Sequence, residues 1–317
     1  MLSLSAPLQA GTGLDVNRED VATFINNMER SHGIPASETR RILAAAEIQE
    51  PILEAMRRPA EKVKPWYEYR RIFLTDKRID EGVAFWKAHG DTLRSTAEVT
   101  GVPPEIIIGI LGVETLYGRI TGRYRVIDAL STLAFEYPPR SRFFTSELEQ
   151  FLLLAREQSI DPYSATGSYA GAMGGPQFIS SSYRAYAIDA SGDGRVDLWE
   201  DWSDIIGSVA NYFAAHGWQR GGRITARVPG EVPSSKLSDG LKLDRSAAEV
   251  GEYGVPVDGE NNLMVFALEN EEGPEYWVGY PNFYVITRYN RSNMYAMAVY
   301  DLGRAVKSRM EAGDGAG

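Results

Sequence analysis

The sequence predicts a mainly α-helical protein with one small β-rich insertion. Helical hydrophobic periodicity recurs between residues 17 and 218, whereas residues 224–281 combine prolines with alternating apolar and polar side chains. A chain of 317 residues can bury a large core that is divided into subdomains. We therefore expect an N-terminal helical domain (1–96), a helical core (97–223), the β-rich insertion (224–281) and a return to the core with a last helix (282–317).

The first hundred residues read as helices. The first helix has its N-cap at Asn17 and ends at His32, and further helical patterns cover residues 37–48 and 80–99. The apolar stripe of the first helix consists of Val21, Phe24, Ile25 and Met28. All three histidines precede a glycine, as is typical of helix C-termini, where an imidazole complements the dipole: His32, His89 and His216. Histidine chemistry is therefore not expected.

The helix predicted from Pro103 to Gly118 contains the most informative residue, Glu114. Prolines stand in its first turn, and Gly118 supplies a left-handed stop. The residues three, four and seven positions before Glu114 are all apolar, so the carboxylate lies on the buried stripe. Burial and the helix dipole both raise the pKa of a carboxyl at this position, as a general acid near neutral pH requires. A buried glutamate paired with an arginine remains the alternative.

A glycine-rich loop at 168–178 lies between helical patterns at 147–157 and 204–216. Its glycines permit close approach of a ligand to the backbone, and Ser168 and Gln177 offer hydrogen bonds. A tight structural turn explains the loop equally well. After the β-rich insertion, the segment 282–289 precedes a last helix near 293–310.

Residues 189–200 have the pattern of an EF-hand-like calcium loop. Oxygen-bearing side chains occupy positions 1, 3, 5, 9 and 12, and glycine occupies position 6. A hard cation needs such clustering because oxygen ligands must replace its hydration shell. The alternative is an Asp/Gly-rich turn without an ion. The sequence contains one such loop, whereas calcium sensors usually pair them, so we expect a structural role.

Composition excludes several classes of function. The net charge of −10 and the pI near 5.0 argue against nucleic acid and anionic membranes as partners, and leave a neutral glycan compatible. The absence of cysteine excludes disulfides, thiol catalysis and thiolate metal sites. No apolar run reaches the roughly 18 residues of a transmembrane helix. Residues 1–8 lack the basic and apolar regions of a signal peptide, so none is expected there.

Five segments occur in a characteristic order and spacing. They are Val113–Gly118, Gly171–Phe178, the calcium loop, Ile206–Phe213 with His216–Trp218, and Asn282–Asn290. Together they resemble the bacterial lytic murein transglycosylases of the membrane-bound B type, soluble forms included, a group similar to glycoside hydrolase family 103. The resemblance extends from about Trp66 to Ala312. It implies a lysozyme-like helical core, a helical N-terminal domain, a small β domain and one structural Ca²⁺.

The resemblance also implies an activity and a site. It implies non-hydrolytic cleavage of the MurNAc–GlcNAc β-1,4 bond of peptidoglycan, with 1,6-anhydro-MurNAc ends as product and Glu114 as the single acid and base. The residues that match the glycan-binding positions of the family are Ser168, Gln177, Phe178, Tyr212, Tyr289, Asn290 and Tyr295. The residues that match its calcium ligands are Asp189, Ser191, Asp193, Arg195 through its carbonyl, and Asp204. Glu200, at position 12 of the loop, is the alternative last ligand, although we favour Asp204.

The remaining expectations concern surroundings and alternatives. The family implies glycan strands of peptidoglycan as substrate, other cell-wall enzymes as possible partners, and the periplasm as location; a lipid anchor is unsupported because no lipobox cysteine exists. A hydrolytic muramidase would need a second carboxylate or a held water near Glu114. A non-catalytic peptidoglycan-binding protein could lose the acid, and an isolated calcium-binding module would leave the other motifs unexplained.

Overall fold

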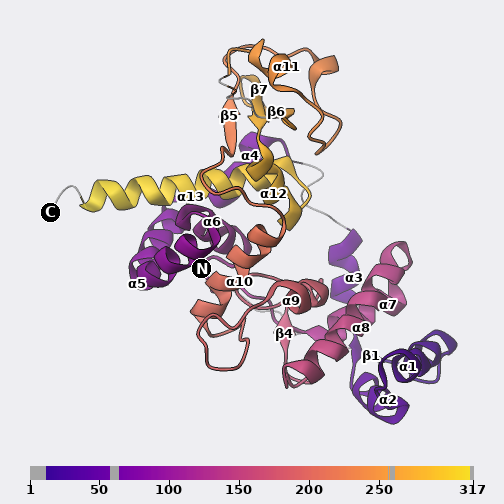
Figure 1. Ribbon diagram of the computed structural model, residues 1–317. Helices are drawn as coiled ribbons and strands as arrows, with labels where there is room; N and C mark the ends of the chain where they lie inside the picture. The colour runs from indigo at the N-terminus through magenta and orange to yellow at the C-terminus, as the bar shows by residue number, and fades with distance from the viewer. Residues whose placement is uncertain (1–11, 58–63, 256, 258–260, 315–317) are drawn as a thin grey trace, which may run out of the picture. The chain divides into compact units, whose positions relative to one another are not determined.

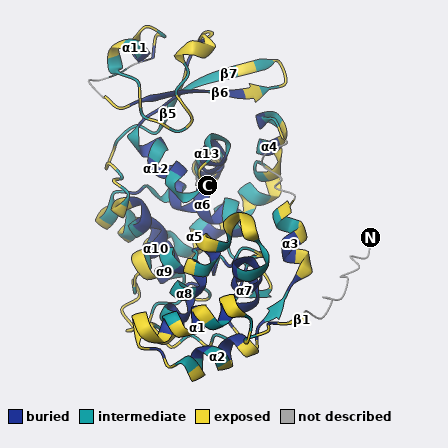
Figure 2. Ribbon diagram, turned by 90° about the vertical axis from the view of Figure 1, so that its right-hand side faces the viewer, coloured by how far each residue is buried: buried dark blue, intermediate teal, exposed yellow. Residues whose placement is uncertain are grey.

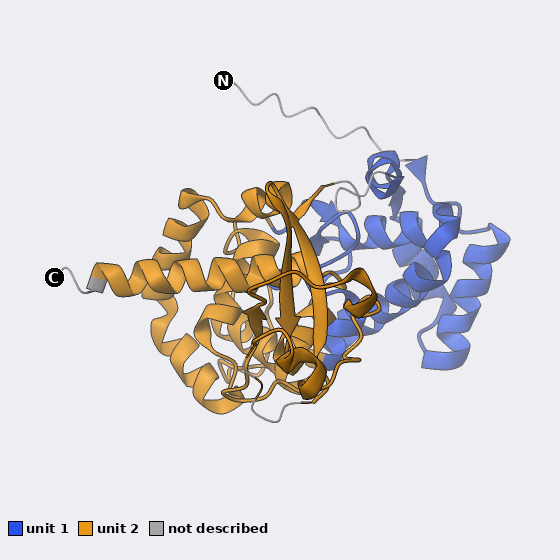
Figure 3. Cartoon of the chain, turned by 90° about the horizontal axis from the view of Figure 1, so that it is seen from above, with its two compact units in different colours: residues 1–59, 121–185 blue, residues 60–120, 186–317 orange. Residues whose placement is uncertain are grey.

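The computed structural model describes residues 12–57, 64–255, 257 and 261–314 (Figure 1). The expectation about a signal peptide concerns residues 1–8, which lie outside this range. Contacts between residues divide the chain into two compact units, residues 1–59 with 121–185 and residues 60–120 with 186–317 (Figure 3). Each unit therefore combines segments that are far apart in the sequence, and the four-segment division stays a prediction.

Unit 1 is helical, with short two-residue strand pairs. Its elements are β1 (Thr12–Gly13), α1 (Glu19–His32), α2 (Ala36–Ala44), β2 (Glu47–Ile48), α3 (Glu50–Arg57), β3 (Tyr124–Arg125), α7 (Val126–Glu136), a 3-10 turn (Pro138–Arg140), α8 (Ser141–Glu157), β4 (Thr166–Gly167) and α9 (Ser180–Tyr186). The last residue of α9, Tyr186, already belongs to unit 2. Strands β1 and β2 are antiparallel, as are β3 and β4. Helices α7 and α8 pack against each other.

The first helix confirms the predicted stripe but not the predicted cap. All four apolar stripe residues of α1 are buried, and Gly33 ends the helix with a φ of 66°. The N-cap is Arg18, so the prediction of Asn17 was wrong by one residue. The Asn17 side chain is used elsewhere, because its Oδ1 atom accepts a hydrogen bond from Arg40 over 3.1 Å.

Unit 2 is built around helix α6 (Pro104–Thr115), which packs against α5 (Asp76–Thr100), α10 (Trp202–Ala215) and α13 (Asn293–Asp314). Helices α4 (Trp66–Phe73) and α12 (Pro281–Tyr289) also contact α13. Figure 2 shows α6 in the buried colour, in agreement with the complete burial of its residues 106–111. An all-round apolar helix of this kind is stable only inside a core.

The histidine-glycine pairs stand at helix ends at two of the predicted places and at a kink between two helical segments at the third. His216 caps α10, and its Nδ1 atom lies 2.7 Å from the Tyr212 carbonyl oxygen. His89 has non-helical angles, φ −119° and ψ 21°, at a kink where two helical segments of α5 meet, so the first of these segments ends at the predicted histidine. Its ring contacts those of Phe85 and Trp202, at centroid distances of 4.5 and 5.4 Å.

The β-rich insertion is confirmed as a three-stranded antiparallel sheet. Strands β5 (Thr225–Arg227), β6 (Met264–Asn270) and β7 (Gly273–Gly279) have the order β5-β7-β6. Gly279 pairs with both Met264 and Thr225. A 3-10 turn (Ser234–Lys236) and α11 (Ala247–Gly251) lie between the first two strands, and a separate apolar cluster of valines, Leu263 and Tyr280 fills the insertion.

The mainly helical class with small sheets is the one that the sequence predicts. Among the helices of the described residues, none alone is long and apolar enough to cross a membrane. Helices α5 and α6 reach that length and composition only as a pair, which is bent by 116°.

Candidate active site and calcium loop

A close crossing of α6 and α13 positions Glu114. A Cβ atom on Gly109 would lie 2.2 Å from the Val299 carbonyl oxygen, and one on Gly303 would lie 2.1 Å from the Glu105 carbonyl oxygen. Cβ atoms do not approach other atoms so closely, so the two backbones touch here only because both positions are glycine. Side chains on α13 can therefore reach groups on α6 directly.

Tyr295 is the residue that α13 brings to Glu114. Its hydroxyl donates a hydrogen bond to the Glu114 Oε1 atom over 2.5 Å, between residues 181 positions apart in sequence. Tyr295 is 2% exposed, whereas Glu114 is half-buried. Burial, together with the Glu114 carboxylate, raises the pKa of Tyr295 well above its ordinary value. The hydroxyl thus remains a proton donor throughout the neutral range.

The chain turns sharply where α6 ends. The helix stops at Thr115, before the predicted stop at Gly118. Leu116 and Tyr117 already have left-handed φ angles of 50° and 56°. That conformation is costly for residues with a Cβ atom. Packing offsets the cost, since Tyr117 is 7% exposed and its ring stacks on Phe85 with 5.5 Å between centroids.

Two glycines make room for the Tyr117 ring. A Cβ atom would lie 2.4 Å from the Tyr117 hydroxyl oxygen if placed on Gly82 of α5, and 2.6 Å from it if placed on Gly112 of α6. The Arg78 Nη1 atom donates to the Gly112 carbonyl over 3.0 Å. The Tyr117 hydroxyl has no hydrogen-bond partner in the described chain, and burial raises its pKa. The sequence analysis did not predict that Tyr117 supports the end of α6. The signal that could have indicated it is Gly82, a glycine inside helix α5.

Two predicted glycan-binding tyrosines, Tyr212 and Tyr289, lie against each other with 4.9 Å between ring centroids. The Tyr212 hydroxyl donates to the Arg288 carbonyl over 2.7 Å, and its ring stacks on His216 at 4.1 Å. Burial raises the pKa of Tyr212 to about 12, and burial together with the Glu114 carboxylate raises that of Tyr289. Neither hydroxyl ionises near neutral pH.

Five predicted site residues therefore belong to unit 2: Glu114, Tyr212, Tyr289, Asn290 and Tyr295. Asn290 is the half-buried residue that follows Tyr289 and caps α12. Tyr212 is only 8% exposed, so the surface that this cluster offers comes mainly from Glu114, Tyr289 and Asn290.

The other three predicted residues, Ser168, Gln177 and Phe178, belong to unit 1. They form part of a glycine-rich loop that is not helical, as predicted. The Ser168 hydroxyl oxygen accepts two backbone amides of the loop, over 3.3 and 3.1 Å. The Gln177 Nε2 atom donates to the carbonyls of Thr121 and Gly174, both over 3.0 Å. Phe178 is 2% exposed, so the loop is tightly organised by its own contacts.

The predicted calcium loop is organised by its first carboxylate. Asp189 accepts three backbone amides, over 2.6, 3.2 and 2.8 Å, and the Ser191 hydroxyl over 3.3 Å. These bonds, the Gly194 amide first, lower the pKa of Asp189. Ser191, Asp193 and Arg195 are exposed. In the described residues no three acidic or histidine side chains converge as a metal cluster, and the other oxygens of the loop are hydroxyl and carbonyl groups.

Asp204 ties the calcium loop to α10. It is 1% exposed, its Oδ1 atom accepts the amides of Ala190 and Ser191 over 2.8 and 3.1 Å, and its Oδ2 atom accepts the Asp197 amide over 2.8 Å. Glu200, in contrast, is exposed. All donors that these residues offer are oxygens, the ligand type that Ca²⁺ prefers. The chemistry of the loop therefore fits a calcium ion.

Asp301 of α13 is a titratable residue that sequence reasoning missed. Burial raises its pKa to about 6, although Arg70 and Arg304 act in the opposite direction. The residues three and four positions before it are apolar and fully buried. The criterion that singled out Glu114, a carboxylate on a buried helical stripe, could thus have found Asp301 as well.

Comparison with known proteins gives consistent matches over nearly the whole chain. The family described as Transglycosylase SLT domain matches residues 17–304. The membrane-bound lytic murein transglycosylase B of Escherichia coli (strain K12) is 44% identical over 303 residues, which cover 92% of this chain and 83% of that protein.

Solved structures match equally well. The catenated lytic transglycosylase SltB1 from Pseudomonas aeruginosa has a TM-score of 0.87 and 48% identity, over 92% of this chain and 98% of its own. The Escherichia coli lytic transglycosylase Slt35 in complex with calcium has a TM-score of 0.86 and 41% identity, over 98% of this chain and 99% of its own.

Proposed function

Because this chain belongs to the transglycosylase SLT domain family of lytic murein transglycosylases, we propose that Glu114 is its single catalytic acid and base. The protein is a lytic transglycosylase, a lyase that cleaves peptidoglycan without hydrolysis. The observation that carries the assignment to Glu114 is its hydrogen bond from the buried Tyr295 hydroxyl at the end of an apolar helix.

The proposed reaction uses one carboxyl twice. Neutral Glu114 donates its proton to the oxygen that links N-acetylmuramic acid to N-acetylglucosamine, and the C1–O bond breaks. The acetamido group of the muramic residue stabilises the cation that develops at C1. The Glu114 carboxylate then removes the proton of the C6 hydroxyl, whose oxygen attacks C1 and closes the 1,6-anhydro ring. Glu114 ends protonated, as it began, and no water is consumed.

The surroundings of Glu114 support both proton transfers. The Tyr295 hydroxyl donates to the Oε1 atom of Glu114 and so holds the carboxyl group in place for both transfers. The raised pKa values of Tyr289 and Tyr295 keep both phenols neutral, so they stabilise the carboxylate without adding negative charge. The apolar residues of α6 exclude water from the helix side, which favours the internal nucleophile over hydrolysis.

The remaining predicted residues are proposed glycan contacts. In unit 2, Tyr289 and Asn290 would present a ring and an amide to the sugars, and Tyr212 would hold Tyr289 in place through ring contact. In unit 1, Ser168, Gln177 and Phe178 would contribute the contacts implied by the family. The close backbone approaches of their loop support a preformed surface, since a Cβ on Gly122 would lie 2.1 Å from the Gly167 carbonyl oxygen.

We also propose one structural Ca²⁺ in the 189–204 segment. Its ligands would be Asp189, Ser191, Asp193, Asp204 and the carbonyl of Arg195. A relative of known structure was solved with calcium, and the donors here are all oxygens. The buried position of Asp204, bonded to the start of the loop, favours it over the exposed Glu200. When bound, the ion would neutralise the clustered carboxylates and join the loop to α10.

The proposed location is the periplasm, where the glycan strands of peptidoglycan are accessible. Other enzymes that build or degrade the cell wall are the proposed partners. Both proposals follow from the substrate class of the relatives.

The product of digestion tests the proposed chemistry. The native protein is expected to release 1,6-anhydro-muropeptides from purified sacculi, as measured by mass spectrometry. Glu114→Gln is expected to keep its melting temperature and to lose activity by about two to four decades, because one residue carries both proton transfers. Products with mainly reducing ends would instead establish hydrolysis, and an active Glu114→Gln variant would move the acid to another residue.

A further inference from the structure

A cavity of about 720 Å³ lies in unit 2 at the kink of α5, and we call it the kink cavity. Its volume is within the roughly 300–1,000 Å³ that small-ligand sites occupy. The proposed reaction and the calcium loop use no side chain of this cavity. It is lined by residues 86–92 and Arg94 of α5, Pro104 at the start of α6 and Met310 near the end of α13.

The kink allows α5 to form a concave wall. Residues 86–92 are consecutive, and a straight helix makes one turn every 3.6 residues, so seven consecutive side chains would point in all directions around it. The angles of His89, φ −119° and ψ 21°, interrupt the helix in the middle of this stretch. The chain therefore bends around the cavity, and both helical segments of α5 contribute to one surface.

Ion pairs hold α13 against the other two helices that line the kink cavity. The Arg309 guanidinium donates to Asp80 and Asp76 of α5, over 2.6 and 2.7 Å. Lys307 donates to Glu105 of α6 over 2.8 Å. Arg309 and Glu105 are direct sequence neighbours of residues that line the cavity. Together with the close crossing of α6 and α13, these pairs keep the three walls in place before any ligand binds.

The lining combines an aromatic ring with groups that exchange hydrogen bonds. Trp86 is half-buried, and no aromatic ring of the described residues packs against it. Arg94 and Asp91 pair over 3.1 Å and are both exposed, so they neutralise each other at the edge of the cavity. Burial lowers the pKa of His89, so its neutral imidazole offers one donor and one acceptor. Lys87 adds one positive charge.

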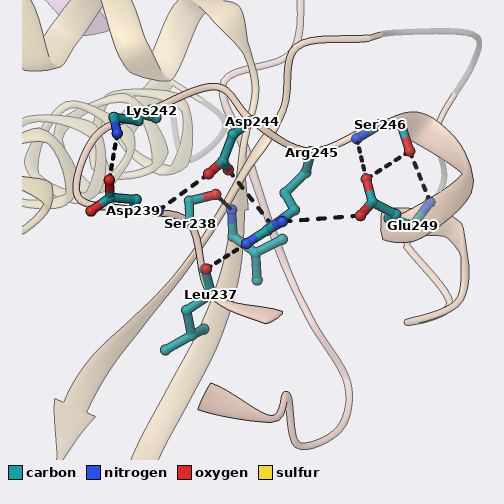
Figure 4. A network of polar contacts seen from close by, with 9 residues as sticks. Leu237, Ser238, Asp239, Lys242, Asp244, Arg245, Ser246 and Glu249 are labelled. Carbon is teal, nitrogen blue, oxygen red and sulfur yellow. Dashed lines mark hydrogen bonds and ion pairs between the residues drawn. The ribbon is translucent and has the colours of Figure 1, made fainter. Parts of the chain in front are cut away.

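The polar surface of the β-rich insertion is of a different kind (Figure 4). There Lys242 pairs with Asp239, and Arg245 donates to the Leu237 carbonyl over 2.6 Å and lies 3.6 Å from Asp244. The charged groups of that network are thus paired within the insertion itself. The kink cavity, in contrast, presents a ring and hydrogen-bonding groups together.

An uncharged, hydroxylated ligand with one apolar face matches the lining of the kink cavity. A pyranose ring has such a face, because its axial C–H bonds can pack on an indole ring while its hydroxyl and acetamido groups exchange hydrogen bonds at the edge. A strongly anionic ligand matches less well, because Asp91 already neutralises Arg94 and leaves Lys87 alone to bind it.

We propose that the kink cavity is a second glycan-binding site, which takes a neutral N-acetylhexosamine residue of murein on the Trp86 ring. The proposal rests on the proposed function, because the ligand belongs to the same polymer as the substrate. Glu114 does not line this cavity, so the site binds glycan without cleaving it. Attachment of one polymer at two sites raises its effective concentration at the acid, and fragments too short to reach both sites gain nothing.

Nuclear magnetic resonance of the tryptophan indoles tests the site directly. The full chain with Glu114→Gln is titrated with chitotriose, a neutral oligomer of N-acetylglucosamine. The protein has 6 tryptophans, and the indole N–H signal that is missing in Trp86→Phe identifies Trp86. We expect this signal to shift as chitotriose is added, and to reach saturation.

Two matched variants in the same background locate the binding. Ala88→Phe places a ring in the cavity from an exposed lining position and should abolish the shift of the Trp86 signal. Val99→Phe, at an 81% exposed position of the same helix outside the cavity, is the control and should leave the shift unchanged.

Kinetics with an intact Glu114 give a second readout. On purified sacculi, Ala88→Phe is expected to raise KM about tenfold with kcat unchanged, because attachment through the second site is lost. On short soluble glycan fragments the same variant should match the native enzyme. Val99→Phe should match it on both substrates.

Three outcomes would overturn the assignment. A Trp86 signal that does not move, or that moves equally in Ala88→Phe, would mean that the kink cavity takes no sugar. An equal rise in KM on sacculi and on short fragments would mean that the substitution only disturbs the helices around Glu114. Failure of the proposed function gives a different result, namely no anhydro products from the native enzyme, whereas the chitotriose titration requires no turnover.

Discussion

Tyr295 and Asp301, both on α13, have raised pKa values, and burial is the first cause in each case. The consequences differ because the ordinary pKa is 10.0 for a tyrosine and 3.8 for an aspartate. Tyr295 simply stays neutral at every physiological pH and keeps donating to Glu114. Asp301 titrates near pH 6, so its ionisation changes the stability of the helix that holds Tyr295.

Asp301→Asn is expected to change the pH dependence of stability. The pKa of about 6 in the folded protein lies above the ordinary 3.8, so folding favours the protonated form. The contribution of this group to the free energy of unfolding is therefore full below pH 3.8 and is lost as the pH rises through 6. A shift of this size corresponds to at most about 3 kcal/mol. The melting temperature of Asp301→Asn relative to the native protein should rise between pH 4 and pH 7.

Removal of a different carboxylate serves as the control for Asp301. Glu98 is exposed, and Glu98→Gln should leave the shape of the stability curve unchanged. A difference between Asp301→Asn and the native protein that is constant across pH would show that folding does not change the pKa of Asp301.

Glu114 could be singled out from the sequence because its signal is local: a carboxylate among residues that recur every three or four positions. Its partner could not. Tyr295 is 181 positions away, and the contact depends on a backbone crossing at Gly109 and Gly303 that no periodicity reveals. The glycan-binding residues and calcium ligands came from the family resemblance, and they stay predictions.

At the scale of elements, the end of α6 determines where Glu114 points. Leu116 and Tyr117 have left-handed backbone angles that cost free energy, and the burial of Tyr117 against Phe85 offsets that cost. The ring also fills the space that Gly82 and Gly112 leave between α5 and α6. Tyr117 therefore acts as a positioning residue for Glu114. Its hydroxyl makes no hydrogen bond to Glu114.

Two substitutions of Tyr117 separate this role from hydrogen bonding. Tyr117→Phe removes a hydroxyl without a partner in the described chain, so activity and melting temperature should be retained. Tyr117→Ala should cost about 3–5 kcal/mol, as other large-to-small aromatic changes do, and should lower kcat more than it raises KM. Equal losses in both variants, measured by steady-state kinetics and thermal melting, would contradict the packing role.

Other element boundaries show where local signals fail. The sequence predicted a helix end at His89, and the structure has a non-helical kink at that residue, after which a second helical segment of α5 continues. The cap predicted at Asn17 shifted to Arg18 because the Asn17 side chain bonds to Arg40. At Asn17 a contact from a distant segment therefore outweighed the local preference, whereas at His89 the local signal was correct.

At the scale of the whole molecule, the sequence predicted the mainly helical class and the β-rich insertion correctly, because both depend on composition and periodicity. It did not reveal that each compact unit is made of two segments, which are separated in the sequence by a segment of the other unit. That arrangement depends on contacts between distant segments, such as the packing of α13 on α6 in unit 2, which leave no periodic trace.

Removal of calcium is expected to destabilise the molecule rather than to stop the chemistry directly. An ion that binds only the folded state adds about 2.7 kcal/mol at a hundredfold excess over Kd, so a chelator should lower the melting temperature. Asp193→Ala should abolish this response to the chelator. Activity should fall only in proportion to the unfolded fraction. A chelated protein that stayed folded yet lost all turnover would require a metal in the reaction itself.

The crossing of α6 and α13 has a consequence for the order of events during synthesis. A ribosome makes Glu114 long before Tyr295, which is 181 positions later, and the segment between them includes the whole β-rich insertion. The hydrogen bond between them cannot form until α13 has emerged and docked on the glycines of α6. The catalytic site of an enzyme that cleaves the cell wall is therefore completed only at the end of synthesis. A chain whose synthesis stops in the β-rich insertion contains Glu114 but lacks the tyrosine that holds it.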